Sequence, residues 1–545
     1  MARMTGGEAI VDGLLRHGVD TMFGLPGVQV YGLFDAFARN SNRMRLIHTR
    51  HEQTTAYMAV GYACATGQPS AFAVVPGPGV MNTTAALVTG WGLNAPVLGL
   101  TGQVPSSQIG RLRGGLHEMP DQLATLKSML KYADRIEHPT EAPYKVAMAF
   151  HHMLSGRPSP VALEMPWDQF PAIADVTPQD PLPLAPVPQP DREKIKELAA
   201  MIDAAKAPMI WVGSGAIHAA DEILALAEKI GCPVASFRTG RGIVDARHPL
   251  GLTVTAASNL WATTDLLIGI GTRMDTATGR WGPGAGGATG PGVKLARIDI
   301  DPAEQRRLKV DLGIVADSAQ AVAALTPLVT ARQDPARAAV IAAAKARAHA
   351  DIRAKVQPQM GYVDAIRDVL PENGIICDEV TQVGYASWIG MPIYSPRTLI
   401  TSGFSGTLGA GVPMALGVKV AHPDRPVVSI TGDGGFLIGG VELATAVQFG
   451  INLIIVMFNN AAYGNVYRDQ HRLFDGRDSG SALVNPDFQT YAKAFNVPSW
   501  RVTDAAGLKA ALVEAMAANA PCLIEVMTDI TKEPIPFEFF VPPKA

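Results

Sequence analysis

The chain has 545 residues, which is more than one hydrophobic core supports, so we expect about three domains of about 100–200 residues each. Its 46 basic and 49 acidic residues leave a net charge of −3, which excludes the basic surface that nucleic acid or an anionic membrane would attract. No apolar run reaches the ~18–20 residues of a membrane span, and residues 1–8 lack the apolar core of a signal peptide. The four cysteines are scattered, which argues against a zinc site or a disulfide framework. We therefore expect a soluble cytoplasmic protein without nucleic-acid or membrane partners.

Two segments are predicted to separate the domains. Residues 171–191 are rich in proline and should run extended over the surface. Residues 331–357 are rich in alanine and arginine and read as a linking helix that stops before Pro358. The predicted domains are therefore 1–170, 192–330 and 358–545.

Short apolar strands alternate with helical patterns in all three segments. Examples are Ala71–Val75, Met209–Val212, Leu266–Ile270 and Ile375–Cys377, most of them followed by glycine or aspartate. This alternation predicts an α/β protein with three doubly wound parallel sheets. The first and last segments are candidates for the same fold.

Residues 431–436, Thr-Gly-Asp-Gly-Gly-Phe, form the most specific motif of the chain. They follow the apolar residues 427–430, a predicted buried strand, and we expect them to form a turn whose backbone N–H groups face phosphate oxygens. A helical pattern at 442–448 and a second apolar strand at 452–458 come next. A strand, helix and strand of this length return the chain to the same sheet edge, so Asn460, 27 residues after Asp433, is expected beside it.

One carboxylate and one amide oxygen suit Mg²⁺, which keeps octahedral oxygen coordination and takes further ligands from water and phosphate. Asp433 and Asn460 therefore predict a metal site that a phosphate-bearing cofactor completes. Either half alone also fits an ordinary turn or strand exit.

Together, at this spacing, the two halves resemble the thiamine diphosphate motif of the family that includes acetolactate synthase, pyruvate decarboxylase and benzaldehyde lyase. The resemblance implies thiamine diphosphate and Mg²⁺ as cofactors and names the three domains pyrimidine-binding, central and diphosphate-binding. It also implies metal ligation by Asp433, Asn460 and Ala462. The implied cofactor-binding residues of this region are Gly432, Asp433, Gly434, Gly435, Asn460, Ala462, Tyr463 and Gly464.

Arg50-His51-Glu52-Gln53 resembles a second signature of this family, in which the glutamate contacts the cofactor's pyrimidine ring. The thiazolium C2 is a very weak acid in water, and a proton held at pyrimidine N1′ favours the imine that deprotonates it. Glu52 is the implied catalytic residue for that proton. Taken alone, Glu52 also fits a carboxylate that satisfies a helix N-terminus. In the family, the two halves of the site come from different subunits, which implies a homodimer or homotetramer with active sites at the interface.

Residues 402–409 resemble the family segment whose backbone grips the pyrimidine edge. The resemblance implies that Gly406 contacts the cofactor and that Leu408 wedges beneath it. An ordinary core leucine is the alternative interpretation of Leu408.

The reaction class depends on side chains around the reacting carbon. Family decarboxylases place proton donors where this chain has Val28, Val75 and Val466. Apolar residues there disfavour protonation of the enamine intermediate, so we predict a carboligase or lyase that acts on a 2-oxo acid such as pyruvate, or on aldehyde or ketone substrates. The alternatives are a non-oxidative 2-oxo acid decarboxylase and a nucleotide-binding homologue without thiamine catalysis.

The predicted substrate pocket contains Val28, Gln29, Pro76, Leu116 and Val466. His117 is the one histidine expected near the reacting carbon, as a second catalytic residue that orients a carbonyl or carboxylate. Arg468 is a candidate for binding a substrate carboxylate, and a charged surface face is the alternative. The aromatic tail, residues 533–543, is a candidate lid.

The middle segment carries Gly213-Ser-Gly215 and Ile298-Asp299-Ile300-Asp301, which look like parts of a nucleotide fold. In the resembling family this domain binds flavin dinucleotide, ADP or nothing. The sequence leaves these three alternatives open, with FAD as a candidate cofactor.

Overall fold

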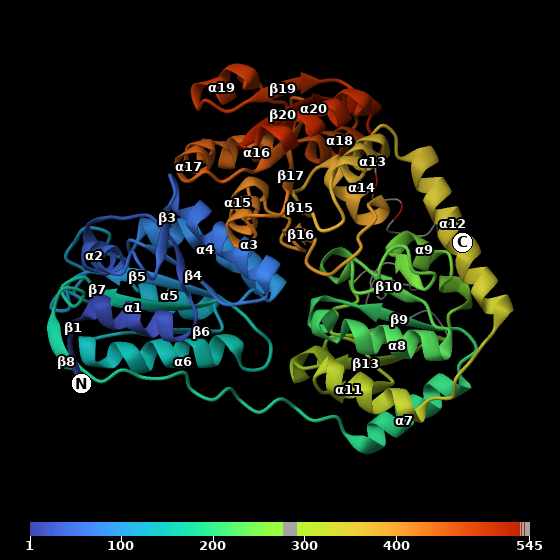
Figure 1. Cartoon of the computed structure of the whole chain (residues 1–545), viewed down its shortest axis with the longest axis horizontal. Coiled ribbons are helices and arrows are strands. Elements are labelled where there is room, and N and C mark those ends of the chain that lie inside the picture. Colours follow the sequence, from blue (N-terminus) through green and yellow to red (C-terminus); the bar gives the residue numbers. More distant parts are fainter. Residues whose placement is uncertain (276–291, 535, 537–538, 540–545) are drawn as a thin grey trace.

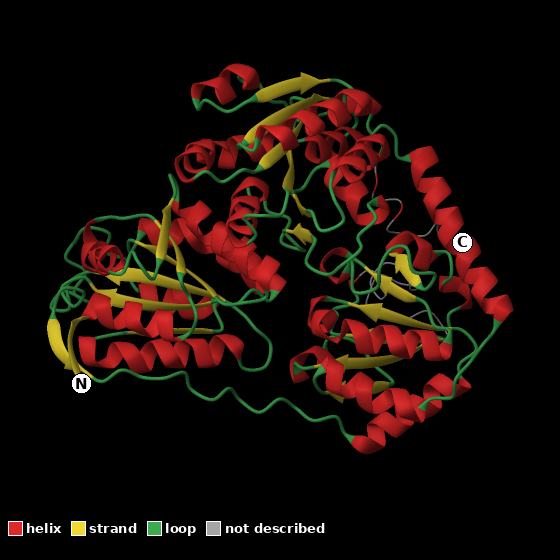
Figure 2. Ribbon diagram, in the orientation of Figure 1, coloured by secondary structure: helices red, strands yellow, loops and turns green. Residues whose placement is uncertain are grey.

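The computed structural model of the chain describes residues 1–275, 292–534, 536 and 539. It contains three α/β domains, the first and last of which meet through helices in Figure 1. Figure 2 shows each as a layer of strands with helices on both faces. Each sheet has six parallel strands, so the predicted fold class is confirmed.

The N-terminal domain has the strand order β3-β2-β4-β5-β7-β6. A short antiparallel pair, β1 with β8, joins its two ends. Its strands are β1 Ala2–Thr5, β2 Thr21–Gly24, β3 Arg45–His48, β4 Ser70–Val74, β5 Val97–Gln103, β6 Tyr132–Arg135, β7 Val161–Pro166 and β8 Ile173–Val176, and its helices are α1 Gly6–Arg16, α2 Tyr31–Arg39, α3 Glu52–Thr66, α4 Pro78–Leu93, α5 Gln122–Met129 and α6 Ala142–Leu154.

The C-terminal domain has the order β16-β15-β17-β18-β20-β19. Counted from the first strand of each sheet, this order equals that of the N-terminal domain, so the two domains share a topology. Its strands are β15 Ile375–Asp378, β16 Leu399–Thr401, β17 Val427–Gly432, β18 Ile454–Asn459, β19 Ser499–Val502 and β20 Cys522–Met527, and its helices are α13 Gln359–Val369, α14 Gln382–Gly390, α15 Gly411–Ala421, α16 Asp433–Gly439, α17 Leu443–Phe449, α18 Gly464–Leu473, α19 Phe488–Ala494 and α20 Ala505–Ala518.

The central domain has a different order, β11-β10-β9-β12-β13-β14. Its first three strands run outward from β9 and its last three run outward from β12, which is the order of dinucleotide-binding folds. The elements are α7 Arg192–Ala204, β9 Pro208–Val212, α8 Ala220–Ile230, β10 Val234–Ser236, β11 Gly251–Thr253, α9 Val254–Ser258, β12 Leu266–Ile270, β13 Lys294–Asp299, β14 Leu312–Val315 and α11 Ser318–Leu325.

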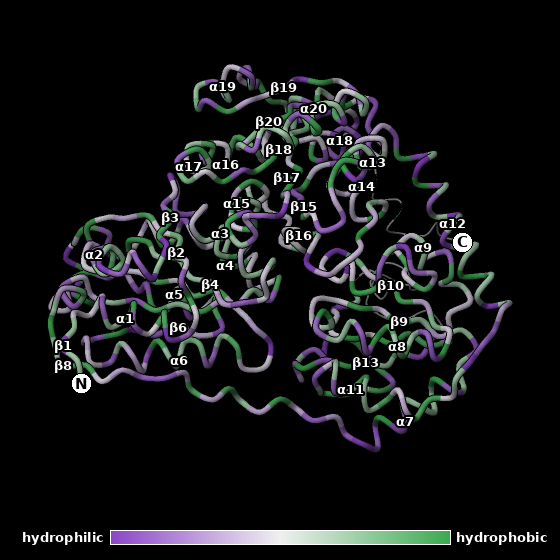
Figure 3. The backbone as a smooth tube through the Cα atoms, in the orientation of Figure 1, coloured by the Kyte–Doolittle hydropathy of each residue, from purple (hydrophilic) through white to green (hydrophobic). Residues whose placement is uncertain are grey.

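Parallel sheets bury both faces, and the apolar runs predicted from the sequence lie in this buried position. Every residue of β4, β9, β12 and β15 is buried, and Figure 3 shows the hydrophobic segments in the interiors of the three domains. Helix α3 of the N-terminal domain crosses α15 of the C-terminal domain so closely that a Cβ at Gly61 would lie 2.1 Å from the backbone oxygen of Met414. This crossing fixes the two domains against each other.

Three predicted segments differ in detail. The segment 171–191 contains β8 and is otherwise without helix or strand, and the linking helix is α12, Pro335–Lys355. The turn expected after residue 430 is instead the end of β17 followed directly by helix α16 at Asp433, because extended Gly432 caps the helix and Phe436 provides a buried apolar anchor. Within the described part of the chain, no helix is long and apolar enough to cross a membrane.

Candidate functional site

The C-terminal sheet changes direction between β15 and β17, because β16 lies outside β15 while β18 continues from β17. Ligands of open α/β sheets bind at the carboxyl ends of strands beside such a change of direction. Asp433 follows β17 there, and β18, which ends at Asn459, pairs with β17 so that Gly432 lies opposite Phe458. The fold therefore brings Asp433 and Asn460 to one edge.

Asp433 is 2% exposed and is held by the loop after β18. Its Oδ2 accepts a 2.7 Å hydrogen bond from Nδ2 of Asn485, and the same nitrogen donates to Oδ1 of Asn459 at 3.0 Å. The backbone N–H of Ala461 also donates to Asp433, yet burial raises the pKa of this carboxyl. A bound cation would offset that cost of burial.

The loop from Asn459 to Gly464 is pinned by residues 481–485. The N–H of Tyr463 donates to the carbonyl of Ser481 at 2.8 Å, and the N–H of Leu483 donates to the carbonyl of Ala461 at 2.8 Å. Ala461 has a φ of 55°, so the backbone reverses sharply there. The reversal leaves Asn460 and Ala462 adjacent, with Oδ1 of Asn460 accepting from the N–H of Ala462 at 3.2 Å.

Glycine is required at two positions of α16. A Cβ at Gly434 would lie 2.5 Å from the ring of Tyr463, and a Cβ at Gly435 would lie 2.1 Å from Oε1 of Glu379. The predicted cofactor-binding glycines thus permit close packing of Tyr463 and Glu379 against the helix.

The oxygen donors fit Mg²⁺. The described residues contain no group of three or more His, Cys, Asp and Glu side chains that could enclose a metal, so one carboxylate, one amide and one carbonyl of Ala462 would leave positions for water and phosphate. Oδ1 of Asn485, beside Asp433, is buried without a hydrogen-bond partner among the described residues. Water on a bound metal would supply the missing donor.

Glu379, which the sequence reasoning missed, lies beneath this site. Its Oε2 accepts from the hydroxyl of Thr431 at 2.6 Å, its Oε1 accepts from the N–H of Gly409, and the N–H of Gly411 donates as well. Glu379 therefore joins the end of β17 to the start of α15. An acid two residues after the apolar run Ile375–Cys377 was the available signal.

Burial raises the pKa of Glu379 to about 7 from its ordinary value of 4.5. The folded protein then binds this proton more tightly than the unfolded chain does. The stabilisation that protonated Glu379 contributes is therefore complete below pH 4.5 and is lost as the pH rises to about 7. We expect the free energy of unfolding to fall by about 3 kcal/mol more in wild type than in Glu379→Gln over this window. Glutamine keeps the contacts, since its amide can donate to Thr431.

Urea unfolding of both proteins at several pH values, followed by tryptophan fluorescence, measures this difference. Asp378, whose pKa burial also raises to about 7, is present in both proteins and cancels. Parallel pH profiles would contradict the assignment.

Glu52 begins α3, and the imidazole Nδ1 of His51 caps the helix by accepting from the N–H of Gln53. Oε2 of Glu52 accepts from Nδ2 of Asn82 at 3.0 Å, so the half-buried carboxylate lies beside α4. No hydrogen bond joins Glu52 to the described residues around Asp433.

Within one chain, Glu52 and Asp433 lie apart from each other. Fully buried Glu442, just after α16, accepts from the N–H groups of Arg50 and His51 at 3.0 Å each. Asp433 begins α16 and Glu442 lies nine residues later, so roughly 13 Å of helical rise separates Asp433 from the acid that holds the backbone before Glu52. Sequence reasoning missed Glu442 because its partners lie in another domain.

Most predicted pocket residues gather in the N-terminal domain. Nε2 of Gln29 donates to the carbonyl of Leu116 at 2.7 Å, and Nδ1 of His117 contacts Oε1 of Gln29 at 3.0 Å. His117 has a φ of 61°, and its carbonyl lies 2.4 Å from where a Cβ of Gly77 would be. Val28 and Pro76 follow β2 and β4 at the direction change of this sheet.

Val466 lies apart from that group, on α18 of the C-terminal domain, and is 50% exposed. Gly406 and half-buried Leu408 lie between β16 and α15, where the hydroxyl of Thr407 contacts that of Thr89 at 3.2 Å. Gly406 has a φ of 56°. Within one chain, the predicted site residues therefore fall into two groups, one in the N-terminal domain and one in the C-terminal domain.

Arg468, a candidate for binding a carboxylate of the substrate, instead pairs with Glu533 at 3.1 Å. The expected lid is described only in part, since 535, 537–538 and 540–543 lie outside the described residues. Glu533 itself packs against the loop of Asn460.

A cavity of about 620 Å³ opens where all three domains meet. Gly213 and Gly215 after β9, and Gly271 to Arg273 after β12, line it at the direction change of the central sheet. Nε and Nη1 of Arg273 are buried without hydrogen-bond partners among the described residues.

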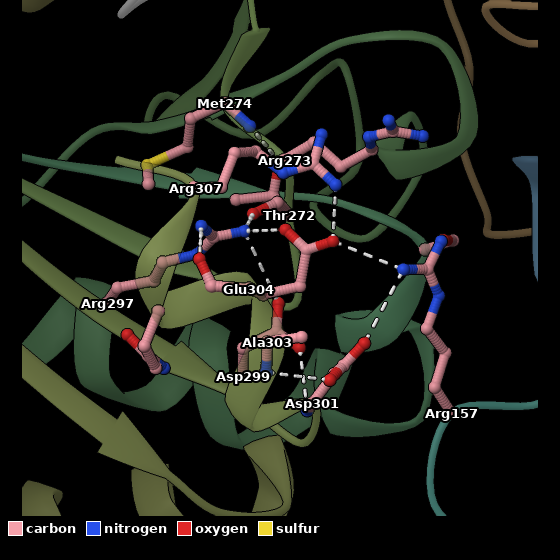
Figure 4. A network of polar contacts seen from close by, with 12 residues as sticks. Arg157, Thr272, Arg273, Met274, Arg297, Asp299, Asp301, Ala303, Glu304 and Arg307 are labelled. Carbon is pink, nitrogen blue, oxygen red and sulfur yellow. Dashed lines mark hydrogen bonds and ion pairs between the residues drawn. The ribbon is translucent and has the colours of Figure 1, made fainter. Parts of the chain in front are cut away.

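Figure 4 shows the polar network beside this cavity. Fully buried Arg297 donates to Oε2 of Glu304 at 2.6 Å and to the carbonyl of Thr272 at 2.8 Å. Oε1 of Glu304 accepts from Arg307 and, at 3.1 Å, from Arg157 of the N-terminal domain. The network fixes the floor of the cavity and ties two domains together.

Comparisons with known proteins cover all three domains. Family profiles of thiamine pyrophosphate enzymes match as an N-terminal TPP binding domain over residues 4–125, a central domain over 195–325 and a C-terminal TPP binding domain over 379–526. Acetolactate synthase of Arthrospira platensis is 31% identical over 96% of this chain and 94% of its own length. Acetolactate synthase isozyme 1 large subunit of Escherichia coli is 30% identical over 100% and 97%. A probable 2-ketoarginine decarboxylase of Pseudomonas aeruginosa is 31% identical over 96% and 94%.

Proposed function

The chain belongs to the thiamine pyrophosphate enzymes, and we propose that it is a carboligase or lyase that acts on 2-oxo acids with thiamine diphosphate and Mg²⁺. Two features together carry the proposal. Oxygen donors that suit Mg²⁺ lie at Asp433, and apolar side chains occupy the positions where a decarboxylase would have proton donors. Relatives that are named acetolactate synthase and align with nearly the whole chain support the same reaction class.

In this proposal Asp433, Asn460 and the carbonyl of Ala462 would hold Mg²⁺, and the backbone N–H groups at the start of α16 would bind the diphosphate. When bound, thiamine diphosphate supplies a nucleophilic carbon that adds to the 2-oxo group and stabilises the charge left by decarboxylation. Glu52 holds a proton at the pyrimidine N1′ and so favours the tautomer that activates this carbon. Leu408 would pack against the bound cofactor.

Glu52 and Asp433 serve different sites of a homodimer in this proposal. Each chain presents exposed apolar side chains on α4 and on α16 and the turn after it, including Met81, Val88, Leu437, Ile438 and Val441. Such a surface is typical of a subunit interface. A two-fold axis through it would bring Glu52 of one chain to the metal loop of the partner and give two equivalent sites.

Val28 and Val466 border the reacting carbon in such a dimer, with Val75 buried behind them. None of the three can donate a proton, so these side chains would not quench the negative charge left by decarboxylation, and this favours joining to a second carbonyl over release of an aldehyde. His117, fixed by Gln29, orients that acceptor or the substrate carboxylate. A decarboxylase remains the second candidate, favoured by the named relative from Pseudomonas aeruginosa.

Products formed from pyruvate test this proposal. Purified protein with Mg²⁺ and thiamine diphosphate should release carbon dioxide and form acetolactate or acetoin in preference to acetaldehyde. Free acetaldehyde as the sole organic product would establish the decarboxylase instead. Absence of cofactor binding in calorimetry would favour a nucleotide-binding homologue.

The 620 Å³ cavity supports a second ligand, an adenine nucleotide with FAD as one candidate. The central strand order, the glycines after β9 and β12, and the guanidinium of Arg273, whose buried Nε and Nη1 make no hydrogen bond to the described residues and whose Nε lies 3.7 Å from Asp275, favour a phosphate-bearing molecule. Chromatography of the ligand released by heat from purified protein should detect FAD or ADP. An empty supernatant from protein prepared with both nucleotides would contradict it.

We propose a cytoplasmic location, since the four cysteines are free thiols, as is usual for proteins of a reducing compartment.

A further inference from the structure

The segment after β20 folds back onto the loop that carries the metal ligand Asn460. The N–H of Thr528 donates to the carbonyl of Asn459 at 2.8 Å, and a short 3₁₀ turn, Ile530–Lys532, then returns the chain to α18. We call residues 528–533 the return segment. It places Glu533 beside Asn460.

The Glu533 carboxylate is shared by three donors. Its Oε2 accepts from Nδ2 of Asn460 at 3.1 Å and from Nη1 of Arg468 at 3.1 Å, and the hydroxyl of Thr528 donates as well. The side chains of Glu533 and Arg468 are only 5% and 14% exposed. A buried ion pair thus stands directly behind the amide of Asn460.

The contact decides which way the amide points. A carboxylate only accepts hydrogen bonds, so the end of the amide that faces Glu533 must be the NH₂ group. Oδ1 of Asn460 then faces the opposite side, where it accepts from the N–H of Ala462. An amide binds Mg²⁺ through oxygen, so this is the orientation that the proposed ligand requires.

The amide of Asn460 packs closely against the backbone at Gly464. A Cβ at Gly464 would lie 2.8 Å from Nδ2 of Asn460 and 3.8 Å from Oε2 of Glu533. Arg468 is held in turn by Oδ1 of Asn465 at 2.9 Å, whose Nδ2 donates to the hydroxyl of Tyr385 at 3.1 Å. The guanidinium of Arg468, which binds Glu533, is therefore held in place by contacts within α18 and between α18 and α14.

We propose that Glu533 is a positioning residue for Mg²⁺: it orients the amide of Asn460 and thereby couples metal binding to docking of the return segment. The proposal rests on the proposed function, because it takes Asn460 as a metal ligand. Groups that orient metal ligands commonly contribute about 10–100-fold to metal affinity. By reciprocity, metal binding stabilises the docked return segment by the same factor.

Titration of Mg²⁺ into the full-length protein at saturating thiamine diphosphate, without substrate, tests this coupling by near-ultraviolet circular dichroism. Glu533→Ala should raise the apparent Kd for Mg²⁺ by about 10–100-fold. Glu533→Gln, which keeps the shape and one acceptor but loses the attraction to Arg468, should give a smaller increase. Lys532→Ala is the matched control, because exposed Lys532 pairs with Asp529 in the same turn and with no other acid among the described residues.

Hydrogen exchange provides the second readout. Mg²⁺ with thiamine diphosphate should slow exchange of the Thr528 amide in wild type and in Lys532→Ala, and much less in Glu533→Ala. An unchanged Kd in both Glu533 variants, with wild type binding normally, would overturn the positioning role alone. Wild type that binds no Mg²⁺ and thiamine diphosphate would overturn the proposed function and this inference together.

Discussion

Replacing Glu52 by glutamine is expected to slow proton exchange at thiazolium C2 by about 10²–10⁴-fold and to lower turnover of a 2-oxo acid with it. Glutamine matches glutamate in size and can still contact Asn82, but it cannot hold an ionisable proton at N1′. The metal loop is untouched, so the affinity for thiamine diphosphate and Mg²⁺ should change little. Exchange is measured by acid quench and NMR of the bound cofactor.

Glu8→Gln is the matched control for this variant. Glu8 lies in the first turn of α1 as Glu52 lies in the first turn of α3, so both substitutions remove a charge that favours a helix N-terminus, worth about 0.3–1 kcal/mol. Exchange should be normal in Glu8→Gln. Normal exchange in Glu52→Gln would leave Glu52 as a helix-terminus carboxylate without a catalytic role.

Replacing Asp433 by alanine is expected to weaken Mg²⁺-dependent binding of thiamine diphosphate by more than about 100-fold, which exceeds the range for a group that only orients a ligand. Asp433 provides the one carboxylate of the proposed site, and its removal also leaves Nδ2 of Asn485 with a single acceptor, Asn459. Isothermal calorimetry at fixed Mg²⁺ measures the loss.

Asp504→Ala controls for the loss of a carboxylate at a helix start. Asp504 caps α20 in the same domain by accepting from the N–H of Gly507, and its removal costs about 1 kcal/mol of stability. Binding of the cofactor should be normal in this variant. Equal binding by Asp433→Ala and wild type would remove Asp433 from the metal site.

Local sequence patterns were sufficient to predict the strands and the pairing of two of them at one edge of a sheet. The apolar run Leu266–Ile270 predicted its strand to the residue, and the interval from Asp433 to Asn460 predicted that β17 and β18 pair. Such signals are strong because burial on both faces demands continuous apolar residues. The helix that begins at Asp433 escaped prediction, because three glycines in six residues read as a turn unless the packing of Phe436 is known.

Long-range contacts could not be predicted in this way. Asn485 bridges Asp433 and Asn459, Glu442 holds the backbone before Glu52, and Glu533 holds Asn460. Each contact joins residues whose separation in the sequence carries no periodic signal. They form only when the domains and the return segment pack together.

Complementation between the two variants most directly tests the central claim that Glu52 of one chain completes the metal site of another. The Glu52→Gln chain and the Asp433→Ala chain would carry different affinity tags, so that their heterodimer can be purified. In this heterodimer one site would contain both substitutions and the other would contain neither. We predict about half of wild-type carboligation from this heterodimer, although each parental homodimer is inactive. A heterodimer as inactive as its parents would contradict the claim and place both residues in one chain's own site.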